Sequence, residues 1–421
     1  MLEYCFFPSL QKGILFAIIR LTMASSPKLE TLVQDIQKAT SEYEKDKGNG
    51  YPKLSEAIEA LRRAVEPPHI QIMKQRFHSV QNVCLVMALE MKLLEFLTSD
   101  KEKSFTADEL ATLSGYDKAL IARVMRMMTA LNFADDVGYE TYKANAVTIC
   151  QMEPGWLGTL MITNEWPLSY GPFIREYLRK YKPCDLTKTE PLYHFAHNGE
   201  SSWETMRKDP VLKQAFDDAM TVRNKHYTVA WHEKFPAASR LSDISARSAV
   251  PPVIVDIGGN QGVDLQGFAE KNPNFQCELI LQDQPETINR IQPGLDKRIK
   301  PTIYDFFTPQ PVKDAAIYYL KSVLHDWDDA NSLALLSNTA NVMAPDSTLL
   351  IHDMVLADRH ESLVRADMDI LTMMALNGCE RTFTEWSNLL ANVKPPLKIV
   401  KVWSSPKDPQ SVIEAVLADS T

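Results

Sequence analysis

The sequence predicts an α/β protein: a doubly wound, mostly parallel sheet with a terminal β-hairpin, preceded by an all-helical and winged-helix region. Three observations predict it. Val253 to Gly262 is an apolar run that ends in an acidic residue and a glycine-rich turn, which is typical of a buried parallel strand leading into a ligand-binding loop. Beyond it, short apolar runs alternate with helical patterns. The last two apolar runs, Leu397 to Trp403 and Val412 to Ala418, are separated by a tight connection around Pro406 to Pro409 and predict a hairpin.

The composition limits the class of protein and its partners. With 421 residues, 45% of them hydrophobic and 24% charged, the chain has the balance of a globular protein with two or three domains. A net charge of -9 argues against nucleic acid or an anionic membrane as the main partner. The six cysteines include no C-x-x-C pair, so neither a metal site nor a disulfide framework is expected, and a reduced, cytoplasmic setting fits best.

The first 22 residues differ from the rest of the chain. The apolar run from Gly13 to Leu21 is too short to cross a bilayer, and Glu3 precedes it where a signal peptide would carry positive charge. Met23 begins a stretch that resembles a natural start. We therefore expect residues 1–22 to be a disordered or upstream extension without stable membrane association.

Amphipathic helices are expected next, from Leu29 to Lys47 and from Leu54 to Val65, because apolar residues recur there at helical spacing. The following segment, His69 to Leu97, is rich in Met, Val and Leu on more than one face. A helix that is apolar all round must be buried against another element or another subunit. This segment therefore predicts core packing together with a homodimer interface.

The stretch from Thr106 to Asn145 has the outline of a winged helix, with a helix expected from Lys118 to Leu131 and a β-wing from Phe133. That outline suggests DNA binding. The expected recognition helix, however, is interleaved with apolar residues, and the acidic pair Asp135 and Asp136 follows it. We therefore expect no contact with nucleic acid.

Residues 151–240 are expected to be helical and to cover the mouth of the sheet, because many aromatic residues lie between Met152 and Pro236. Some of these aromatic side chains should line an aryl-sized pocket. The polar stretch from Leu241 to Val250 is expected to connect this segment to the domain formed by residues 241–421. In that domain the helices are expected at Val263 to Lys271, Glu286 to Ile291 and Ala330 to Met343, and the further strands at Glu278 to Gln282, near Thr302, at Ala315 to Leu320 and at Thr348 to Met354.

The glycine turn predicts a cofactor site. A dinucleotide fingerprint would need glycine at positions 258, 260 and 263, but Asn260 and Val263 stand at two of them. Asn tolerates left-handed backbone angles, so the turn can form with Asn260. Asp283 ends the second strand, where an acidic residue can accept hydrogen bonds from ribose hydroxyls.

His325 follows the fourth strand, in the sequence Lys321-Ser-Val-Leu-His325-Asp326-Trp327. Deprotonating a phenol or enol near neutral pH needs a base, and an imidazole suits that task. A carboxylate on the other ring nitrogen would hold its tautomer. The sequence offers Asp353 and Glu380 for this position, whereas Asp326 is expected to begin the next helix. His352 should point to the opposite face of the sheet, because side chains alternate along a strand.

Together, the order Asp256-x-Gly258-Gly259-x-x-Gly262 and the Leu-His-Asp-Trp motif resemble the plant and fungal small-molecule O-methyltransferases, which depend on S-adenosylmethionine. The resemblance covers the chain from about Leu29 onward. It implies a Rossmann-like catalytic sheet and, in residues 23–150, a helical and winged-helix dimerisation domain. It implies His325 as the catalytic base with Asp353 and Glu380 beside it, and no metal. For the cofactor it implies contacts from Gly258, Gly259, Gly262, Asp283, Asp305, Phe306 and Lys321.

The expected function is methyl transfer from S-adenosylmethionine to a phenolic or enolic hydroxyl of a secondary metabolite. The substrate pocket is expected to include Met373, Met374 and Asn377, which lie just before Glu380. A second reading stays open, because proteins of this fungal branch also include pericyclases that keep the fold without moving a methyl group. In such an enzyme, His325 or Lys321 would hydrogen-bond a substrate carbonyl. Asn260 in the glycine turn keeps this alternative open, whereas His325, Asp353 and Glu380 favour methyl transfer.

Overall fold

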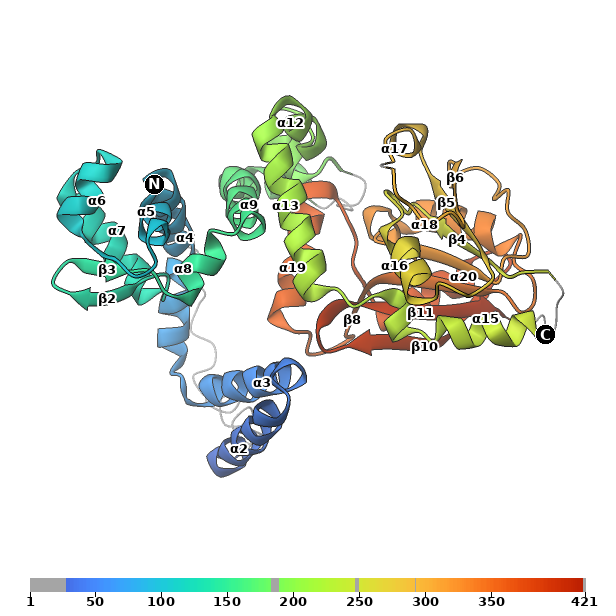
Figure 1. Cartoon of the computed structure of the whole chain (residues 1–421), viewed down its shortest axis with the longest axis horizontal. Coiled ribbons are helices and arrows are strands. Elements are labelled where there is room, and N and C mark those ends of the chain that lie inside the picture. Colours follow the sequence, from blue (N-terminus) through green and yellow to red (C-terminus); the bar gives the residue numbers. More distant parts are fainter. Residues whose placement is uncertain (1–27, 183–188, 247–249, 292, 419–421) are drawn as a thin grey trace, which may run out of the picture. The chain divides into compact units, whose positions relative to one another are not determined.

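The computed structural model describes residues 28–182, 189–246, 250–291 and 293–418. The expected extension at residues 1–22 lies outside this part of the chain. The contacts divide the chain into two units, one ending at His78 and one beginning at Ser79. Each unit is described by itself, and Figure 1 labels the elements of both.

The first unit is built from two packed helices, α2 (Leu29–Lys45) and α3 (Lys47–Val65), followed by the start of α4 (Pro68–Glu90). Helix α3 begins earlier than expected because the Asp46 side chain accepts a hydrogen bond from the Asn49 N–H at 3.1 Å and caps it. Gly50 lets the two helices approach closely, since a Cβ at this position would lie 2.4 Å from the Tyr43 Cα.

The second unit opens with the rest of α4 and a small helix-and-strand region. The expected single segment from His69 to Leu97 is in fact two helices, because Lys92 adopts a left-handed φ of 57° and separates α4 from α5 (Leu93–Ser99). A three-stranded antiparallel sheet in the order β1-β3-β2 follows. The strands of this sheet are β1 (Ser104–Thr106), β2 (Asp135–Gly138) and β3 (Thr141–Lys143). The helices between β1 and β2 are α6 (Ala107–Ser114) and α7 (Lys118–Ala130).

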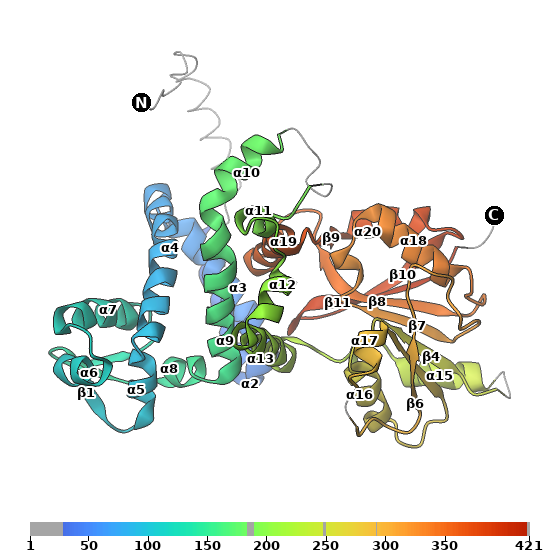
Figure 2. The ribbon, with the colours of Figure 1, turned by 90° about the horizontal axis from the view of Figure 1, so that it is seen from above.

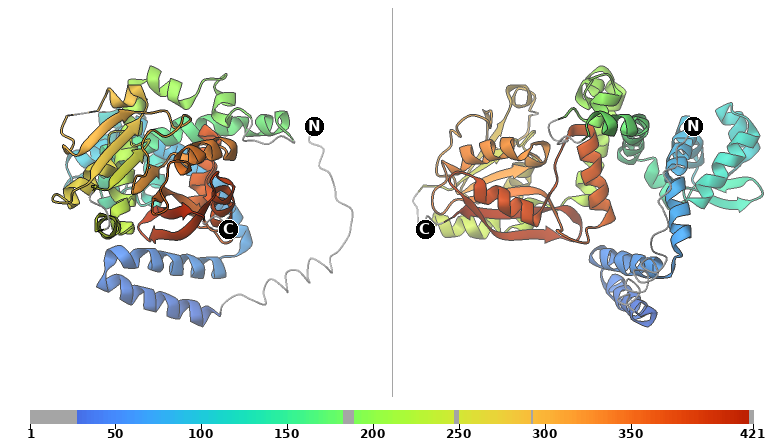
Figure 3. Two further views of the ribbon diagram at one scale, coloured as in Figure 1. Left: turned by 90° about the vertical axis from the view of Figure 1, so that its right-hand side faces the viewer. Right: turned by 180° about the vertical axis from the view of Figure 1, so that it is seen from behind.

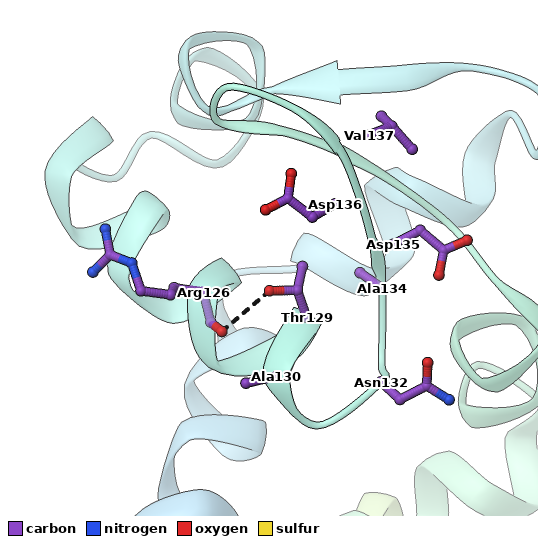
Figure 4. Close-up of a pocket in the computed structure, with 8 residues that line it drawn as sticks. All are labelled: Arg126, Thr129, Ala130, Asn132, Ala134, Asp135, Asp136 and Val137. Carbon is purple, nitrogen blue, oxygen red and sulfur yellow. Dashed lines mark hydrogen bonds between the residues drawn. The ribbon is translucent and has the colours of Figure 1, made fainter.

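Helix α7 buries most of its apolar side chains in the core of this region, namely those of Ile121, Val124, Met125 and Met128. A shallow hollow of about 640 Å³ lies beside the end of α7 and strand β2. Figure 4 shows the residues that line it. One cationic side chain and two carboxylates line it, those of Arg126, Asp135 and Asp136. The charged side chains that line this hollow are therefore negative on balance.

Helices were expected for residues 151–240, and residues 146–182 and 189–245 do consist mainly of helices. The helices are α8 (Ala146–Gln151), α9 (Pro154–Thr163), the π-helical η2 (Asn164–Leu168), the 3-10 turn η3 (Gly171–Phe173), α10 (Ile174–Lys180), α11 (Leu192–Ala196), α12 (Ser202–Lys208), α13 (Pro210–Tyr227), α14 (Trp231–Lys234) and α15 (Ala237–Ser245). Helix α13 packs tightly on α9, because a Cβ at Gly155 would lie 2.3 Å from the Val222 Cβ and one at Gly158 would lie 2.2 Å from the Ala215 carbonyl oxygen.

The expected polar connection from Leu241 to Val250 is wrong in its first half. Helix α15 continues to Ser245, and Leu241 is fully buried in the same core as Ile254 and Leu265 of the sheet region. Burying that leucine on the sheet stabilises the helix more than a solvated loop would.

The main sheet has eight strands, seven of them in the order β10-β11-β8-β7-β4-β5-β6, with β9 pairing with β8. Strands β4, β5, β6, β7 and β8 are parallel, and β10 and β11 form the antiparallel hairpin at the edge. The predicted fold class is therefore confirmed. The strands are β4 (Val253–Ile257), β5 (Glu278–Asp283), β6 (Ile299–Ile303), β7 (Ile317–Lys321), β8 (Thr348–Leu356), β9 (Arg381–Thr382), β10 (Leu397–Ser405) and β11 (Asp408–Leu417).

Helices cover both faces of this sheet. The helices that follow β4 in the chain are α16 (Val263–Lys271), α17 (Pro285–Ile288), the 3-10 turn η5 (Leu324–Asp326), α18 (Asp329–Ala340), α19 (Leu363–Leu376) and α20 (Phe383–Asn392). Of these, α19 packs in the aromatic cluster with Trp166 and Tyr170. Val255 and Leu320 lie in the core beneath α18 and α20, whereas Ile254 and Tyr319 lie in the core beneath α14, α15 and α16. Figures 2 and 3 show the sheet between these layers. The chain order reverses between β7 and β4, and ligands of such sheets bind outside the carboxyl ends of the strands at that point.

A buried ion pair ties helix α14 to the hairpin. The Lys234 Nζ lies 2.7 Å from an Asp408 carboxylate oxygen, 2.9 Å from His352 Nε2 and 2.9 Å from the Gln410 carbonyl oxygen. Burial lowers the pKa of His352 well below its usual value, so the ring is neutral. An ammonium can only donate, so Nε2 accepts from Lys234 and the opposite nitrogen donates to the Tyr319 hydroxyl at 2.8 Å.

Substituting Lys234 with Met should destabilise the fold by about 3–5 kcal/mol, because the Asp408 carboxylate would stay buried without its cation. The matched control is Lys213→Met, which removes the exposed pair with Asp217 on α13 and should cost less than about 0.5 kcal/mol. Denaturant unfolding followed by circular dichroism measures both variants. Equal midpoints for the two would contradict this assignment.

Candidate active site

The glycine turn after β4 is held in left-handed backbone conformations. Gly258, Asn260 and Gly262 have φ values of 74°, 51° and 76°. The N–H groups of Gly258 and Gly259 donate to the Gln282 carbonyl oxygen at 2.8 and 3.2 Å. A Cβ at Gly259 would lie 2.4 Å from Leu281 Cδ1, so only glycine fits there. Asn260 therefore keeps the turn that the middle glycine would otherwise make.

Asp283 fixes this turn from the neighbouring strand. One carboxylate oxygen accepts the Asn260 N–H at 2.9 Å, and the other accepts the Gln284 N–H at 2.7 Å. Each oxygen retains a lone pair for a further donor, such as a ribose hydroxyl. Below the turn, Asp256 is buried with one oxygen unbonded, and burial raises the pKa of its carboxyl group well above the usual value.

The register of the sheet brings four strand ends together. Ile257 at the end of β4 pairs with Gln282 of β5 and with Leu320 of β7. Asp283 of β5 pairs with Ile303 of β6. The glycine turn and the residues that follow β5, β6 and β7 therefore lie along one edge of the sheet.

The remaining predicted cofactor residues lie at this edge. Asp305, after β6, is exposed, and its carboxylate accepts the Phe307 N–H at 3.0 Å. The Phe306 ring contacts the Trp327 ring edge-on, with 6.0 Å between centroids. Lys321 ends β7, and its Nζ lies 3.0 and 3.1 Å from the two oxygens of Asp264 in the first turn of α16. The sequence analysis missed Asp264 as this partner, because the two residues are far apart in the chain.

His325 lies in the short turn η5 after β7, and its Nδ1 is 2.9 Å from a carboxylate oxygen of Glu380. Asp326 is the other close carboxylate, with an oxygen 3.6 Å from Nε2. Burial by itself lowers the pKa of His325. The hydrogen bond to Glu380 and the negative charges of Asp353, Asp326 and Glu380 outweigh burial and raise that pKa to about 9. The imidazole is therefore strongly basic, and Glu380 fixes its orientation.

Arg381 links the segment that carries Glu380 to the turn that carries His325. Its guanidinium is almost fully buried and donates to the carbonyl oxygens of Leu324 and Trp327 at 3.0 and 2.8 Å, on either side of His325. The Cys379 N–H also donates to the His325 carbonyl oxygen at 2.7 Å. The segment that carries Glu380 is thus bonded to the turn that carries His325. Sequence analysis did not single out Arg381, although its position next to Glu380 was a usable signal.

Asp353 is a buried carboxyl group without a hydrogen bond. It is fully buried near the end of β8, and neither of its oxygens has a hydrogen-bond partner in the described part of the chain. Burial raises its pKa to about 7, against the opposing effect of the charge on His325. Asp353 therefore affects the imidazole through its charge, whereas Glu380 bonds to it directly.

The expectation for Asp326 is wrong. The helix after the strand, α18, begins at Asp329, and the Asp328 carboxylate caps it by accepting the Asn331 N–H at 2.8 Å. Asp326 lies in η5 instead, with its oxygen near His325 Nε2. His352 binds Lys234 and Tyr319 on the other face of the sheet, as strand alternation predicts.

The three predicted pocket residues lie at the end of α19. Met374 packs against an aromatic cluster with Trp166 and Tyr170, and the Asn377 side chain donates to the Thr189 carbonyl oxygen at 2.6 Å. The role of Met373, Met374 and Asn377 in a substrate pocket stays a prediction.

The fold and this edge of the sheet are those of a Rossmann-like methyltransferase. A model of the O-methyltransferase domain matches residues 184–393. O-methyltransferase ATR12 of Stachybotrys chlorohalonatus is 32% identical over 417 residues, which cover 94% of this chain and 100% of that protein. The chain therefore belongs to the S-adenosylmethionine-dependent O-methyltransferase family, in its fungal branch, and the predicted resemblance is confirmed.

Two solved structures share the fold. OxaC, solved in complex with SAH and oxaline, is 26% identical and has a TM-score of 0.73, covering 93% of this chain and 99% of that one. A pericyclic reaction enzyme is 23% identical with a TM-score of 0.76, covering 93% and 100%. None of the helices in the described part of the chain is both long and apolar enough to cross a membrane.

The raised pKa of Asp353 predicts a pH dependence of stability. The folded protein holds a proton on this carboxyl up to a pH of about 7, whereas the unfolded chain releases it near pH 3.9. Stability is therefore lost as the pH rises from about 4 to about 7. Asp353→Asn removes this loss, so the free energy of unfolding of the variant should rise relative to wild type across that range, by up to a few kcal/mol.

Denaturant unfolding at pH 4, 5, 6, 7 and 8 measures this difference. The control is Asp346→Asn, an exposed carboxylate before β8, whose difference from wild type should stay flat. If the free energies of unfolding of wild type and Asp353→Asn follow parallel curves against pH, the raised pKa of Asp353 is contradicted.

Proposed function

We propose that this chain transfers the methyl group of S-adenosylmethionine to a phenolic or enolic hydroxyl of a fungal secondary metabolite, with His325 as the general base. The observation that carries the proposal is the 2.9 Å contact between His325 and Glu380 at the carboxyl edge of the sheet. This contact occupies Nδ1, and we assign Nε2, which has an Asp326 carboxylate oxygen 3.6 Å away, to the substrate.

His325 would take the proton of the substrate hydroxyl. Glu380 accepts the Nδ1 proton and so holds Nε2 ready to accept another. With a pKa of about 9, the imidazole is mostly protonated at neutral pH, so it must first release a proton to solvent; its neutral form then takes the proton of a phenol, whose pKa is near 10, at little cost. S-adenosylmethionine supplies, when bound, an electrophilic methyl group on a sulfonium sulfur. Asp353 and Glu380 stabilise the imidazolium that forms.

The cofactor would be held at the same edge. We assign Gly258, Gly259 and Gly262 to its methionine end, Asp283 to the ribose, and Asp305 with Phe306 to the adenine. The left-handed turn, the lone pairs on Asp283 and the ring of Phe306 fit these parts of the molecule. Lys321 lies close by, with Asp264 neutralising its charge.

A metabolite-sized substrate is supported by OxaC, a 26% identical protein solved with oxaline. The second candidate function is that of a pericyclase, since a pericyclic reaction enzyme shares this fold. In that case a protonated His325 would donate a hydrogen bond to a substrate carbonyl, which its raised pKa favours. The methyl-transfer assay described next distinguishes the two functions.

Incubation of the protein with labelled S-adenosylmethionine and a panel of phenols, enols and pyridones tests methyl transfer. We expect labelled product and S-adenosylhomocysteine from wild type. His325→Ala should lower kcat by about 10²–10⁴-fold while calorimetry shows cofactor binding unchanged, because only the base is lost. Near-normal turnover by His325→Ala would refute its role as base.

The control is His360→Asn, which alters an exposed histidine with a left-handed φ of 61° that asparagine tolerates. It should leave kcat unchanged. Conversion of a polyene at unchanged mass, without release of S-adenosylhomocysteine, would support the pericyclase instead.

We also propose that the chain works as a homodimer. Helix α4 carries exposed apolar side chains, including Ile72, Phe77, Val80 and Val83, at 71%, 43%, 50% and 47% exposure. A water-facing helix with such residues on several sides calls for an apolar partner, and a second copy supplies one.

Light scattering on the purified chain should give a mass near twice that of the monomer. Val80→Glu with Val83→Glu should shift the protein toward monomer, because buried charge opposes association. A wild-type monomer at micromolar concentration would contradict the dimer. The exposed substitution Val400→Glu on β10 is the control.

A further inference from the structure

An ion pair bridges the point at which the chain order of the main sheet reverses. Lys321 ends β7, and Asp264 lies in the first turn of α16, which follows the glycine turn. The two carboxylate oxygens of Asp264 lie 3.1 and 3.0 Å from the Lys321 Nζ. Because β4 and β7 are neighbours and Ile257 pairs with Leu320, this pair lies beside the glycine turn, where such sheets bind their ligands.

Asp264 is fixed from below by a chain of hydrogen bonds that can run in one direction only. The Lys234 ammonium donates to His352 Nε2 at 2.9 Å, so the opposite ring nitrogen donates to the Tyr319 hydroxyl at 2.8 Å. The Tyr319 hydroxyl in turn donates to a carboxylate oxygen of Asp264 at 3.4 Å. His352 and Tyr319 are fully buried. Asp264 thus accepts from a hydroxyl and an ammonium at once, an arrangement suited to a carboxylate.

The ion pair is shielded from water on most sides. The side chains of Lys321 and Asp264 are 20% and 21% exposed, so each retains a small surface toward the edge of the sheet. Charges that are partly buried act on a nearby ligand more strongly than charges in water do. With both side chains present, the pair has no net charge. Removal of either side chain leaves one unit charge beside the glycine turn.

The methyl donor and its product differ in charge at one atom. S-adenosylmethionine carries a positive sulfonium where S-adenosylhomocysteine has a neutral thioether, and their amino and carboxylate groups are the same. A Lys321 ammonium without its counter-charge would therefore disfavour the donor relative to the product. General damage to the site would weaken both ligands alike, so the ratio of the two affinities reports the charge alone.

We propose that Asp264 determines which charge the cofactor site accepts: by neutralising Lys321, it lets the cationic donor bind without a penalty relative to the neutral product. The inference rests on the proposed placement of the cofactor beside the glycine turn. It depends neither on His325 as the base nor on the identity of the methyl acceptor.

Calorimetry of the whole chain with S-adenosylmethionine, S-adenosylhomocysteine and sinefungin, each without a methyl acceptor, tests this. Sinefungin carries an ammonium in place of the sulfonium and has no methyl group to transfer. Asp264→Asn should raise the Kd of S-adenosylmethionine relative to that of S-adenosylhomocysteine by about fivefold, and sinefungin should shift with the donor. Lys321→Met leaves the carboxylate alone and should lower the same ratio.

The double variant Asp264→Asn with Lys321→Met removes both charges and should return the ratio to near its wild-type value. The matched control is Glu278→Gln, which breaks the more exposed pair with Lys300 at the start of β5, the end opposite Asp283. This control should leave the ratio unchanged. If Asp264→Asn does not fold, the direction of the shift in Lys321→Met decides the matter.

An unchanged ratio in Asp264→Asn, or shifts of the same sign in both single variants, would overturn the inference and leave the proposed function standing. Failure of wild type to bind either S-adenosylmethionine or S-adenosylhomocysteine would overturn the proposed function as well.

Discussion

The parallel alignment of β6, β5, β4 and β7 is the constraint on which the candidate site depends. Because these strands end at the same level, residues that are far apart in the chain meet at one edge: the glycine turn, Asp283, Phe306 and Lys321. Strands β4, β5 and β7 are short and buried on both faces, so a shift of one residue in register would move polar side chains into the apolar layers. The core beneath α18 and α20 therefore fixes the register that sets the position of the site.

The two histidines of this region have pKa values that shift in opposite directions, because their hydrogen-bond partners differ. His325 gains a proton affinity above that of a free imidazole because Glu380 bonds to it. On the other face of the same sheet, His352 loses its proton because burial and Lys234 disfavour the charged ring. His325 follows β7 and His352 lies on the neighbouring β8, yet the first gains affinity for a proton and the second loses it.

Much of this could be predicted from the sequence, since it depends on local patterns. The bounds of α16 were predicted to the residue, because a glycine turn precedes Val263 and the apolar spacing ends at Lys271. The contact between His325 and Glu380 came from resemblance to a family, because 55 residues separate them and no spacing rule connects them. Arg381, Asp264 and the helical end of α15 were missed for the same reason, since each is fixed by a partner distant in the chain. The end of α4 before Lys92 was not predicted, because lysine rarely adopts left-handed backbone angles and so does not indicate a turn.

Gly155 and Gly158 limit how this scaffold can diversify. At both positions the backbone of α9 lies so close to α13 that any larger residue would push the helices apart. A descendant that keeps these glycines is therefore expected to keep the packing of α13 on α9. In directed evolution, libraries at the two glycines would mostly yield unfolded clones, whereas libraries at exposed positions of α13 would leave its packing on α9 intact.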